Sequence, residues 1–527
     1  MRSPTPAPLA FFRSTDAAWL VLAALGLCLA FPNPLAQAPL LGLLYPVGLA
    51  RLGLAGGKKR VFRLGWLAGL IGNAACLYWI ALPPHDFGGL PWIVAAPFPL
   101  LLAAYIALYS GFFSLAARAF TPLPLFARAF TLGCLWVCLE YLRGWLFTGF
   151  PWLSLSTAFA AWPLCAQGAA LFGAYGLSGC LVFCALLFGL PSTRPLFHAG
   201  AASAIALLLL GYGAYSLKGL SDAEEARHPV LLVQGNTDQH TKWTRKSVAL
   251  AVHEHVRLTE AGLLQNPGTT FVIWAETAVP FSLRDERNLA LPILSLARNA
   301  RISLLLGAPG LTPPHPDREA SLENRAELLT PQGLSGFYAK EHLVPFGEYV
   351  PPFLDFAFLS FALQEIGRFT PGTNREPLHL PDGPALGALI CYEAIFPELA
   401  AERAALGAHV LVNISNDAWF GKSPAMLQHL QQAAMRAIEQ RRWLLRATTN
   451  GLTAIIDAGG RITAAGSSHT ATTVAGEFAP RSDLSLFQRI RAFILPFCLA
   501  ILLIAILACT YYRTSRSGAL PTRTRPN

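Results

Sequence analysis

Apolar runs long enough to cross a bilayer fill the N-terminal part of the chain and recur once near its C-terminus. A helix needs about 20 mostly apolar residues to span roughly 30 Å of hydrocarbon. Eight runs approach that length: 15–32, 37–55, 62–82, 91–117, 129–147, 168–190, 196–217 and 492–510. The first two are short and interrupted by Pro32, Pro34 and Pro46. The pattern predicts a multi-pass α-helical membrane domain of about eight spans.

The region between the seventh and eighth runs has a different pattern. Short apolar runs typical of strands occur at 228–236, 269–276, 301–309, 336–340, 384–393 and 408–416. Helix-like stretches such as 246–264 and 424–441 lie between them. Strands that alternate with helices favour an α/β domain. We therefore expect a membrane domain over 1–217, an α/β domain over 218–486, a last span over 487–512 and a disordered tail over 513–527.

Composition and charge agree with a membrane protein. Of the 527 residues, 54% are hydrophobic and 13% are charged, whereas soluble proteins carry about 25% charged residues. This apolar content excludes intrinsic disorder. The net charge of +10 does not indicate a nucleic-acid partner, because the prominent Lys and Arg residues stand at the ends of apolar runs, where they set membrane orientation.

The positions of these basic residues predict an orientation. With eight spans and a cytoplasmic N-terminus, all the clusters fall on the cytoplasmic side. They lie around Arg13, Lys58–Arg63, Arg118–Arg128, Arg194 and Arg513. Both termini are then cytoplasmic and the α/β domain lies outside. In a bacterium with two membranes, this is the periplasmic side of the inner membrane.

Three ionisable residues follow apolar strand-like runs in the α/β region. Nine of the ten cysteines lie in or beside the apolar spans, which leaves Cys391 without a disulfide partner in its domain. Glu276 follows FVIWA and Lys340 follows GFYA in the same way. Each alone is more often a strand-end or core residue. Together, a thiol, a base and a cation suit acyl transfer, because the thiol must lose a proton and the tetrahedral intermediate needs positive charge at its oxyanion.

The surrounding motifs resemble a known family. WAETAVP at 274–280, KEHLVPFGEY at 340–349 and ICYE at 390–393 resemble the Glu-Lys-Cys blocks of the nitrilase, or carbon–nitrogen hydrolase, superfamily. EYLRGWLFTGFPW at 140–152 resembles a membrane signature of the bacterial apolipoprotein N-acyltransferases. VQGN at 233–236, NISNDAWFG at 413–421 and RATTNG at 446–451 fit that family too. The resemblance extends to about residue 513 and implies that the α/β domain is a nitrilase-like αββα sandwich.

The resemblance also implies a reaction and roles for residues. Such an enzyme moves an acyl chain from a phospholipid, typically the sn-1 chain of phosphatidylethanolamine, to the α-amino group of a diacylglyceryl-cysteine apolipoprotein. Cys391 would be the nucleophile that forms a thioester, Glu276 the general base, and Lys340 the stabiliser of the oxyanion together with the Tyr392 N–H. The mechanism would be ping-pong, without cofactor or metal, and nothing in the chain demands more than a monomer.

Other residues match supporting positions. Glu348 and Glu393 would orient Lys340 and the thiol pocket, although surface carboxylates beside turns are the simpler interpretation. Three tryptophans are candidates for substrate binding: Trp152, Trp243 and Trp419. Packing or a place in an interfacial belt is the alternative for these rings. Glu140 and Arg143, at i,i+3 spacing in a span, are expected to pair with each other. His253 and His255 are expected to be solvated, and His342 receives no acid–base role.

Two other functions remain open from the residues alone. A membrane-tethered amidase or nitrilase could use the same three residues on a small carbon–nitrogen substrate, with water as the second nucleophile. The eight spans and the 140–152 motif weigh against it, because a small soluble substrate needs no access to the bilayer. A non-enzymatic scaffold with a degenerate fold is the other possibility, and the intact Cys391, Glu276 and Lys340 weigh against it.

Overall fold

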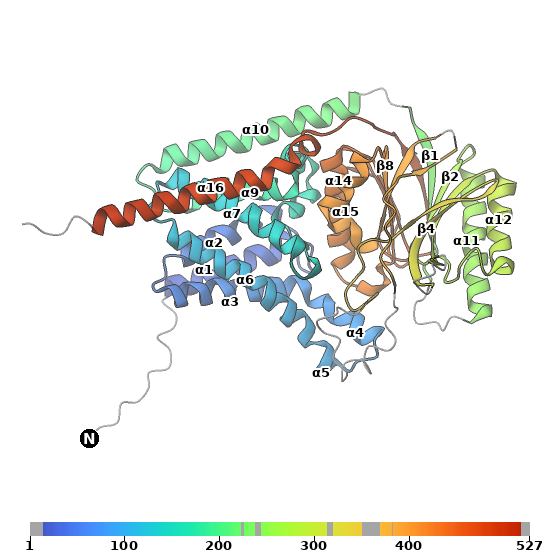
Figure 1. Ribbon diagram of the computed structural model, residues 1–527, viewed down its shortest axis with the longest axis horizontal. Helices are drawn as coiled ribbons and strands as arrows, with labels where there is room; N and C mark the ends of the chain where they lie inside the picture. The colour runs from blue at the N-terminus through green and yellow to red at the C-terminus, as the bar shows by residue number, and fades with distance from the viewer. Residues whose placement is uncertain are drawn as a thin grey trace, which may run out of the picture.

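The computed structural model describes residues 14–222, 226–237, 244–312, 320–349, 369–381 and 383–517. A bundle of apolar helices lies beside a sandwich of two β-sheets (Figure 1). The last helix returns to the bundle after the sandwich, so both ends of the described chain belong to the helical part.

The bundle contains a helix at each of the eight expected positions. Six helical segments are long and apolar enough to cross a membrane, whereas the first two, Ser14–Ala30 and Pro39–Leu52, are shorter. The main helices are α1 (Ser14–Ala30), η1 (Pro39–Leu43) with α2 (Leu44–Leu52), α3 (Lys58–Leu77), α6 (Pro97–Ala119), α7 (Leu125–Trp145), α9 (Ala169–Gly189), α10 (Pro195–Asp222) and α16 (Leu486–Ser517). Short helical pieces connect them: η2 (Tyr78–Ala81), α4 (Leu82–Asp86), α5 (Trp92–Ala95), η3 (Leu146–Thr148), η4 (Leu155–Ala161) and α8 (Pro163–Ala166).

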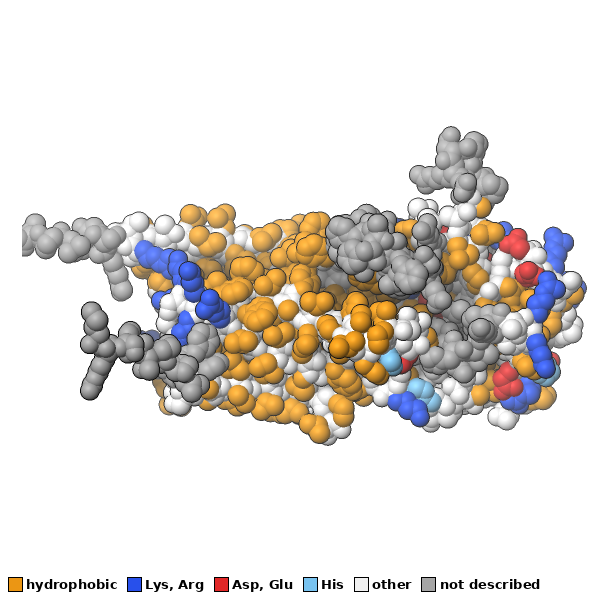
Figure 2. Space-filling view, turned by 90° about the horizontal axis from the view of Figure 1, so that it is seen from below, with side chains coloured by type: hydrophobic (Ala, Val, Ile, Leu, Met, Phe, Trp, Pro, Cys, Tyr) orange, Lys and Arg blue, Asp and Glu red, His pale blue; other side chains and the backbone are white. Residues whose placement is uncertain are grey.

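Apolar side chains cover the outside of the bundle. Figure 2 shows this surface as a broad apolar region, with Lys and Arg gathered at the end farthest from the sandwich. Large side chains such as Leu101, Leu207 and Leu503 are exposed there. A surface of this kind is stable in hydrocarbon rather than in water.

Each sheet of the sandwich has six strands with a parallel centre. The first sheet has the order β12-β1-β2-β3-β4-β5 and the second β11-β10-β9-β8-β7-β6. Strands β1, β2 and β3 run parallel, as do β7, β8 and β9. The first sheet comprises β1 (His228–Gln234), β2 (Phe271–Trp274), β3 (Ser303–Leu311), β4 (Leu322–Thr330), β5 (Gly333–Ala339) and β12 (Thr472–Phe478). The second comprises β6 (Leu378–His379), β7 (Ala385–Ile390), β8 (Val410–Ser415), β9 (Leu444–Thr448), β10 (Ala454–Ile456) and β11 (Ile462–Ala465).

Helices cover both outer faces, which completes the predicted αββα sandwich. Helices α11 (Arg245–Gln265) and α12 (Arg287–Ala300) lie on the first sheet, and α14 (Pro397–Ala405) and α15 (Ala425–Gln440) on the second (Figure 1). Side chains from the inner faces of the two sheets, including Ile273 and Ile390, form one shared core. The six β-strands predicted from short apolar runs are present, whereas β4, β6 and β9–β12 were not predicted.

Helix α15 lies between its sheet and the membrane helices. The indole N–H of Trp152 donates to Gln428 Oε1 at 2.8 Å, and the Ala174 N–H of α9 donates to Glu439 Oε1 at 2.6 Å. Gln37 and Gln431 exchange hydrogen bonds between their amide groups. The second sheet is therefore attached to the bundle through side chains of α15.

Candidate active site

Cys391 lies at the carboxyl end of β7, where it begins the short helix η6 (Cys391–Ile395). Its φ angle is 52°, in the left-handed region that non-glycine residues rarely adopt. Such a conformation costs about 1–3 kcal/mol and persists only where the surrounding structure enforces it. The turn therefore places the thiol beyond the end of the strand.

Glu276 follows β2 and approaches the same edge from the opposite sheet. Its Oε2 accepts a hydrogen bond from the Asn416 backbone N–H at 2.7 Å, and its Oε1 accepts one from Asn324 Nδ2 at 2.8 Å. Gly307 on β3 permits this arrangement, because a Cβ at that position would lie 2.5 Å from the Glu276 Cα. The carboxylate is thereby held in one orientation.

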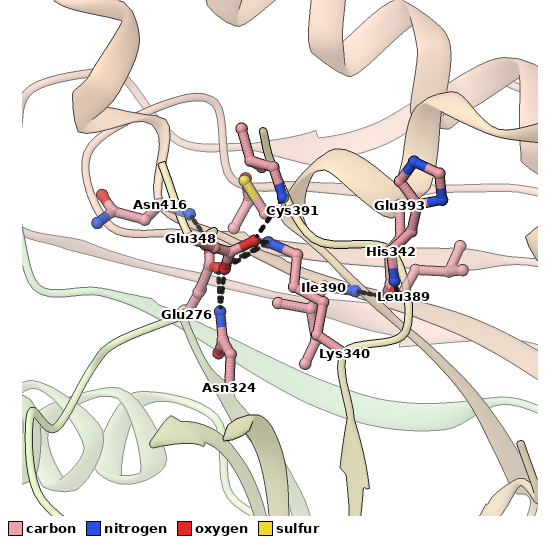
Figure 3. Close-up of polar contacts among 12 residues, drawn as sticks. Glu276, Asn324, Lys340, His342, Glu348, Leu389, Ile390, Cys391, Glu393 and Asn416 are labelled. Carbon is pink, nitrogen blue, oxygen red and sulfur yellow. Dashed lines mark hydrogen bonds and ion pairs between the residues drawn. The ribbon is translucent and has the colours of Figure 1, made fainter. Parts of the chain in front are cut away.

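Lys340 follows β5 and joins two carboxylates. Its Nζ lies 2.9 Å from the Glu348 carboxylate and 3.5 Å from Glu276 Oε1. Asn324 Nδ2 also donates to Glu348 Oε1 at 2.9 Å, and the Val344 N–H donates to Glu348 Oε2 at 2.8 Å. Lys340 is 1% exposed. In Figure 3 the Cys391 sulfur lies beside the ends of Glu276, Glu348 and Lys340.

Electrostatics assign a resting protonation state to the thiol and the ammonium. Burial, together with the Glu276 carboxylate, raises the pKa of the Cys391 thiol, although Lys340 opposes the shift. Burial disfavours the charge of Lys340, but Glu348 and Glu276 outweigh it and hold its pKa above the usual value. The resting thiol is therefore protonated and Lys340 is a permanent cation. A thiol in this state needs a base at the moment of attack, because the thiolate is the nucleophile.

Glu393 has a structural task beside Cys391. Its buried carboxylate accepts hydrogen bonds from the Ile390 N–H at 2.7 Å, the Tyr338 hydroxyl at 2.8 Å, and the N–H groups of Glu341 and His342 at 2.8 and 3.0 Å. These bonds connect the residue before Cys391 to the segment after Lys340 (Figure 3). Glu393 thus joins the strand end of one sheet to the loop of the other.

The remaining candidates are Tyr392 and the three tryptophans proposed for substrate binding, and they differ in exposure and contacts. The Tyr392 hydroxyl donates to the Gly149 carbonyl oxygen at 3.0 Å, which connects the site to the 140–152 motif. Trp152 is 1% exposed, and its ring packs on those of Trp79 and Phe420. Trp419 is 37% exposed and its ring lies 4.5 Å from that of Phe87. Trp243 lies outside the described residues.

Two expectations about polar residues were wrong. Glu140 Oε1 accepts from Trp136 Nε1 and the Leu155 N–H, both at 2.9 Å. Within the described bundle Arg143 donates to the Ser154 hydroxyl oxygen at 3.3 Å rather than to Glu140. Backbone and indole donors satisfy this Glu140 oxygen. His255 is 2% exposed rather than solvated, because its ring packs on Trp274 in the layer between α11 and the first sheet.

His342 has a neutral ring that packs beside the site. Burial lowers its pKa to about 4, so the ring is neutral near pH 7. It packs against Phe396, with the ring centroids 4.0 Å apart.

Several residues of the site were not identified from the sequence. Asn324 contacts both Glu276 and Glu348, yet it lies within a polar strand without a recognisable motif. His429 and Asp417 are fully buried behind Cys391. The sequence offered no distinct signal for His429, because other polar residues, such as Gln432 and Arg436, lie on the same buried helix.

Comparison with known proteins identifies two matching family models and similar full-length relatives. Residues 17–187 match the model of the apolipoprotein N-acyltransferase N-terminal domain, and residues 230–482 match that of carbon–nitrogen hydrolases. An apolipoprotein N-acyltransferase of Geobacter metallireducens is 37% identical over 84% of this chain and 85% of its own length. One of Azotobacter vinelandii is 36% identical over 87% of this chain and 89% of its own length.

This chain belongs to the apolipoprotein N-acyltransferase family. It is therefore a membrane-bound acyltransferase that acts on lipoproteins. Among solved structures, a Saccharomyces cerevisiae member of branch 10 of the nitrilase superfamily matches with a TM-score of 0.37 and 19% identity, covering 50% of this chain and 94% of its own. The carbon–nitrogen hydrolase domain of the family is consistent with a thioester, ping-pong mechanism.

Proposed function

We propose that the protein transfers an acyl chain from a phospholipid of the phosphatidylethanolamine type to the N-terminal amine of a diacylglyceryl-cysteine apolipoprotein. The observation that carries the proposal is the meeting of Glu276 and Lys340, 3.5 Å apart, at the edge where Cys391 leaves β7. The membrane bundle supports a lipid donor, because a soluble domain would have to expose each CH₂ of the chain at about 0.8 kcal/mol.

The first half-reaction forms a thioester. Glu276 takes the thiol proton, and the Cys391 sulfur attacks the ester carbonyl carbon. The oxyanion develops beside the Lys340 ammonium and the Tyr392 N–H, which stabilise it. The C–O bond then breaks, and the lysophospholipid alcohol leaves with the proton from Glu276.

The second half-reaction consumes the thioester. The acceptor amine is an ammonium at neutral pH, so Glu276 removes one proton before the nitrogen attacks the thioester carbon. The amide C–N bond forms and the C–S bond breaks. Glu276 returns its proton to the sulfur, and the second nitrogen proton goes to solvent. Glu348, 2.9 Å from Lys340, and Glu393 act as orienting groups.

The location of the site completes the proposal. We infer domains with the predicted boundaries at 217, 486 and 512, a catalytic domain on the periplasmic side of the inner membrane, cytoplasmic termini and a monomer. The gathering of Lys and Arg at the far end of the bundle supports this orientation (Figure 2). Trp419, which is partly exposed beside Phe87, is a candidate for contact with the acyl chain, and Trp243 remains a second.

A reconstituted transfer assay tests the proposal. Vesicles containing the protein receive phosphatidylethanolamine with a labelled sn-1 chain and a synthetic diacylated lipopeptide. We expect a triacylated lipopeptide that carries the label. A lipopeptide with an acetylated N-terminus is the matched control and should remain unchanged. Hydrolysis of a small soluble amide without phospholipid, with no transfer to the lipopeptide, would contradict the proposal and favour an amidase.

A further inference from the structure

A fully buried polar cluster lies beside Cys391. Arg446 is its centre. One of its nitrogens, Nη2, donates to Asp417 Oδ2 at 2.8 Å and lies 3.0 Å from His429 Nδ1, and Nη1 donates to Asn413 Oδ1. Asp417 Oδ1 accepts a further bond from the Ser415 hydroxyl at 2.7 Å. Such a network fixes the positions of its members, because each buried polar atom left unpaired is costly.

The partners of His429 determine its tautomer. His429 Nδ1 lies 3.0 Å from Arg446 Nη2, which can only donate, and 3.2 Å from Asp417 Oδ1, which can only accept. The other nitrogen therefore decides the tautomer: Nε2 faces the Cys391 carbonyl oxygen, which can only accept, so Nε2 carries the proton. In a neutral ring Nδ1 then accepts from Arg446. Burial and the charge of Arg446 lower the pKa of His429, which keeps the ring neutral although Asp417 opposes the shift. Its Nε2 is 3.1 Å from the Cys391 carbonyl oxygen. His429 therefore donates a hydrogen bond to that oxygen.

The carbonyl oxygen that accepts from His429 belongs to Cys391, the residue with the left-handed backbone conformation. Asn413 Nδ2 lies 3.5 Å from the same oxygen, so two side chains face the Cys391 carbonyl. In a trans peptide, the C=O of one residue and the N–H of the next point in opposite directions. Holding the Cys391 carbonyl toward the cluster thus turns the Tyr392 N–H away from it. Tyr392 is the second residue of η6, where the N–H has no acceptor within the helix.

We propose that His429 is a positioning residue: its Nε2–H bond to the Cys391 carbonyl orients the Cys391–Tyr392 peptide, so that the Tyr392 N–H stabilises the oxyanion together with Lys340. The inference rests on the proposed thioester mechanism. His429 touches neither substrate nor thiol, and it acts only through the peptide that it holds.

The membrane bundle in turn fixes His429. The Trp152 ring lies 5.4 Å from the His429 ring, and its indole N–H donates to Gln428, the preceding residue. Gln428 donates to the carbonyl oxygens of Pro32 at 3.0 Å and Cys76 at 3.3 Å. The orientation of the oxyanion donor thus depends on contacts between α15 and the membrane helices.

Two reactions of the Cys391 thiol distinguish the positioning of the Tyr392 N–H by His429 from a general contribution of His429 to the structure of the pocket. Acylation of Cys391 by phosphatidylethanolamine passes through an oxyanion, whereas alkylation by iodoacetamide displaces iodide and forms none. Both rates are measured on the full-length protein in detergent by mass spectrometry of the Cys391 peptide. For His429→Leu we expect acylation to slow by about 10²-fold, as for loss of an oxyanion donor, with alkylation within about threefold of the unaltered protein. For His429→Gln, whose Nε2 can still donate, we expect most of the acylation rate to return.

Matched variants keep the test decisive. His255→Leu removes the buried histidine of α11, whose Nδ1 bonds to the Ala251 carbonyl oxygen of its own helix at 2.8 Å; both rates should remain unchanged. If His429→Leu does not fold, His429→Asn replaces it, because its shorter amide does not reach the Cys391 carbonyl and should acylate slowly while His429→Gln does not.

Equal losses of acylation and alkylation, or an unchanged acylation rate in His429→Leu, would overturn the positioning role. An absence of any adduct in the unaltered protein would instead contradict the thioester mechanism itself.

Discussion

The two sheets of the sandwich contribute to one site but have different neighbours. Helix α15, on the sheet that carries Cys391, has 15 of its 16 residues buried, because the membrane bundle covers its outer face. Helix α11, in the corresponding position on the sheet that carries Glu276 and Lys340, has six of 21 buried. The half with the proposed nucleophile is therefore fixed to the membrane part, whereas the half with the proposed base and cation has an exposed outer layer. Under the proposed mechanism, this asymmetry holds the attacking sulfur at a constant position relative to the membrane helices.

The largest expected effect on the rate of acyl transfer comes from removing the Cys391 sulfur, which lies on the sheet attached to the membrane bundle. Cys391→Ala should lower the rate of acyl transfer by about 10⁴-fold or more, because removal of a nucleophile leaves only binding and oxyanion stabilisation. The transfer assay measures the rate, and the melting temperature in detergent shows whether the variant is folded. Transfer at more than about a tenth of the normal rate would show that another residue is the nucleophile.

The next largest effect distinguishes the roles of the Glu276 and Glu348 carboxylates, which belong to the half of the sandwich with the exposed outer layer. Glu276→Gln should lower transfer by about 10²–10⁴-fold, the usual contribution of a general base. Glu348→Gln should have a smaller effect, because Lys340 keeps Glu276 at 3.5 Å as a partner. The melting temperature in detergent shows whether both variants are folded. The assignment of the base would be wrong if the Glu348 variant were the slower of the two.

A pair of apolar substitutions measures the asymmetry between the outer layers. Ile438 of α15 is fully buried, whereas Leu264 of α11 is 84% exposed. We expect Ile438→Ala to cost about 2–5 kcal/mol of stability and Leu264→Ala to change it by less than about 0.5 kcal/mol. Thermal unfolding in the same detergent gives both values as shifts of the melting temperature. Similar shifts of the melting temperature for the two variants would contradict the difference in burial between α15 and α11.

The smallest effect depends on pH at the contact between α15 and the bundle. Burial raises the pKa of Glu439 from its ordinary value of 4.5 to about 7, although Arg436 opposes the shift. The folded state then binds more protons than the unfolded state between these values, so Glu439 favours folding below about pH 4.5 and this contribution is lost as the pH rises to about 7.

Glu439→Gln tests this pH dependence. The Gln side chain retains the oxygen that accepts from the Ala174 N–H but does not titrate. We expect the fall in melting temperature between pH 5 and pH 7.5 to be about 2–4 °C smaller than in the unaltered protein, which corresponds to about 1 kcal/mol. An identical pH dependence in the two proteins would mean that Glu439 does not titrate in this range.

The sequence predicted the helices and the three proposed catalytic residues, because long apolar runs and the ends of apolar strands are clear local signals. Apolar length located the helices, and apolar strand ends located Glu276, Lys340 and Cys391 before any contact was known. Strand β4 was missed because LENRAELLT carries three charged residues, although both of its neighbours in the sheet are apolar. Its Asn324 could not be recognised, since its importance arises from contact with residues 48 and 24 positions away.

Two errors show where local rules fail. The i,i+3 rule predicted that Glu140 pairs with Arg143, but the carboxylate turns to the Leu155 N–H, whose position depends on the fold after the helix. His255 was expected in solvent on the polar face of an amphipathic helix at 246–264, yet its own position faces Trp274. The amphipathic pattern did not reveal that this histidine lies on the face that meets the sheet.

The most direct test of the account is mass spectrometry of the Cys391 peptide after incubation with phosphatidylethanolamine and no acceptor. The account predicts an acyl adduct on Cys391 that hydroxylamine removes and that a diacylated lipopeptide discharges, with no adduct in Cys391→Ala. If the folded protein transfers acyl chains and the peptide never carries an adduct, the covalent mechanism, and with it the role of the membrane-fixed thiol, is contradicted.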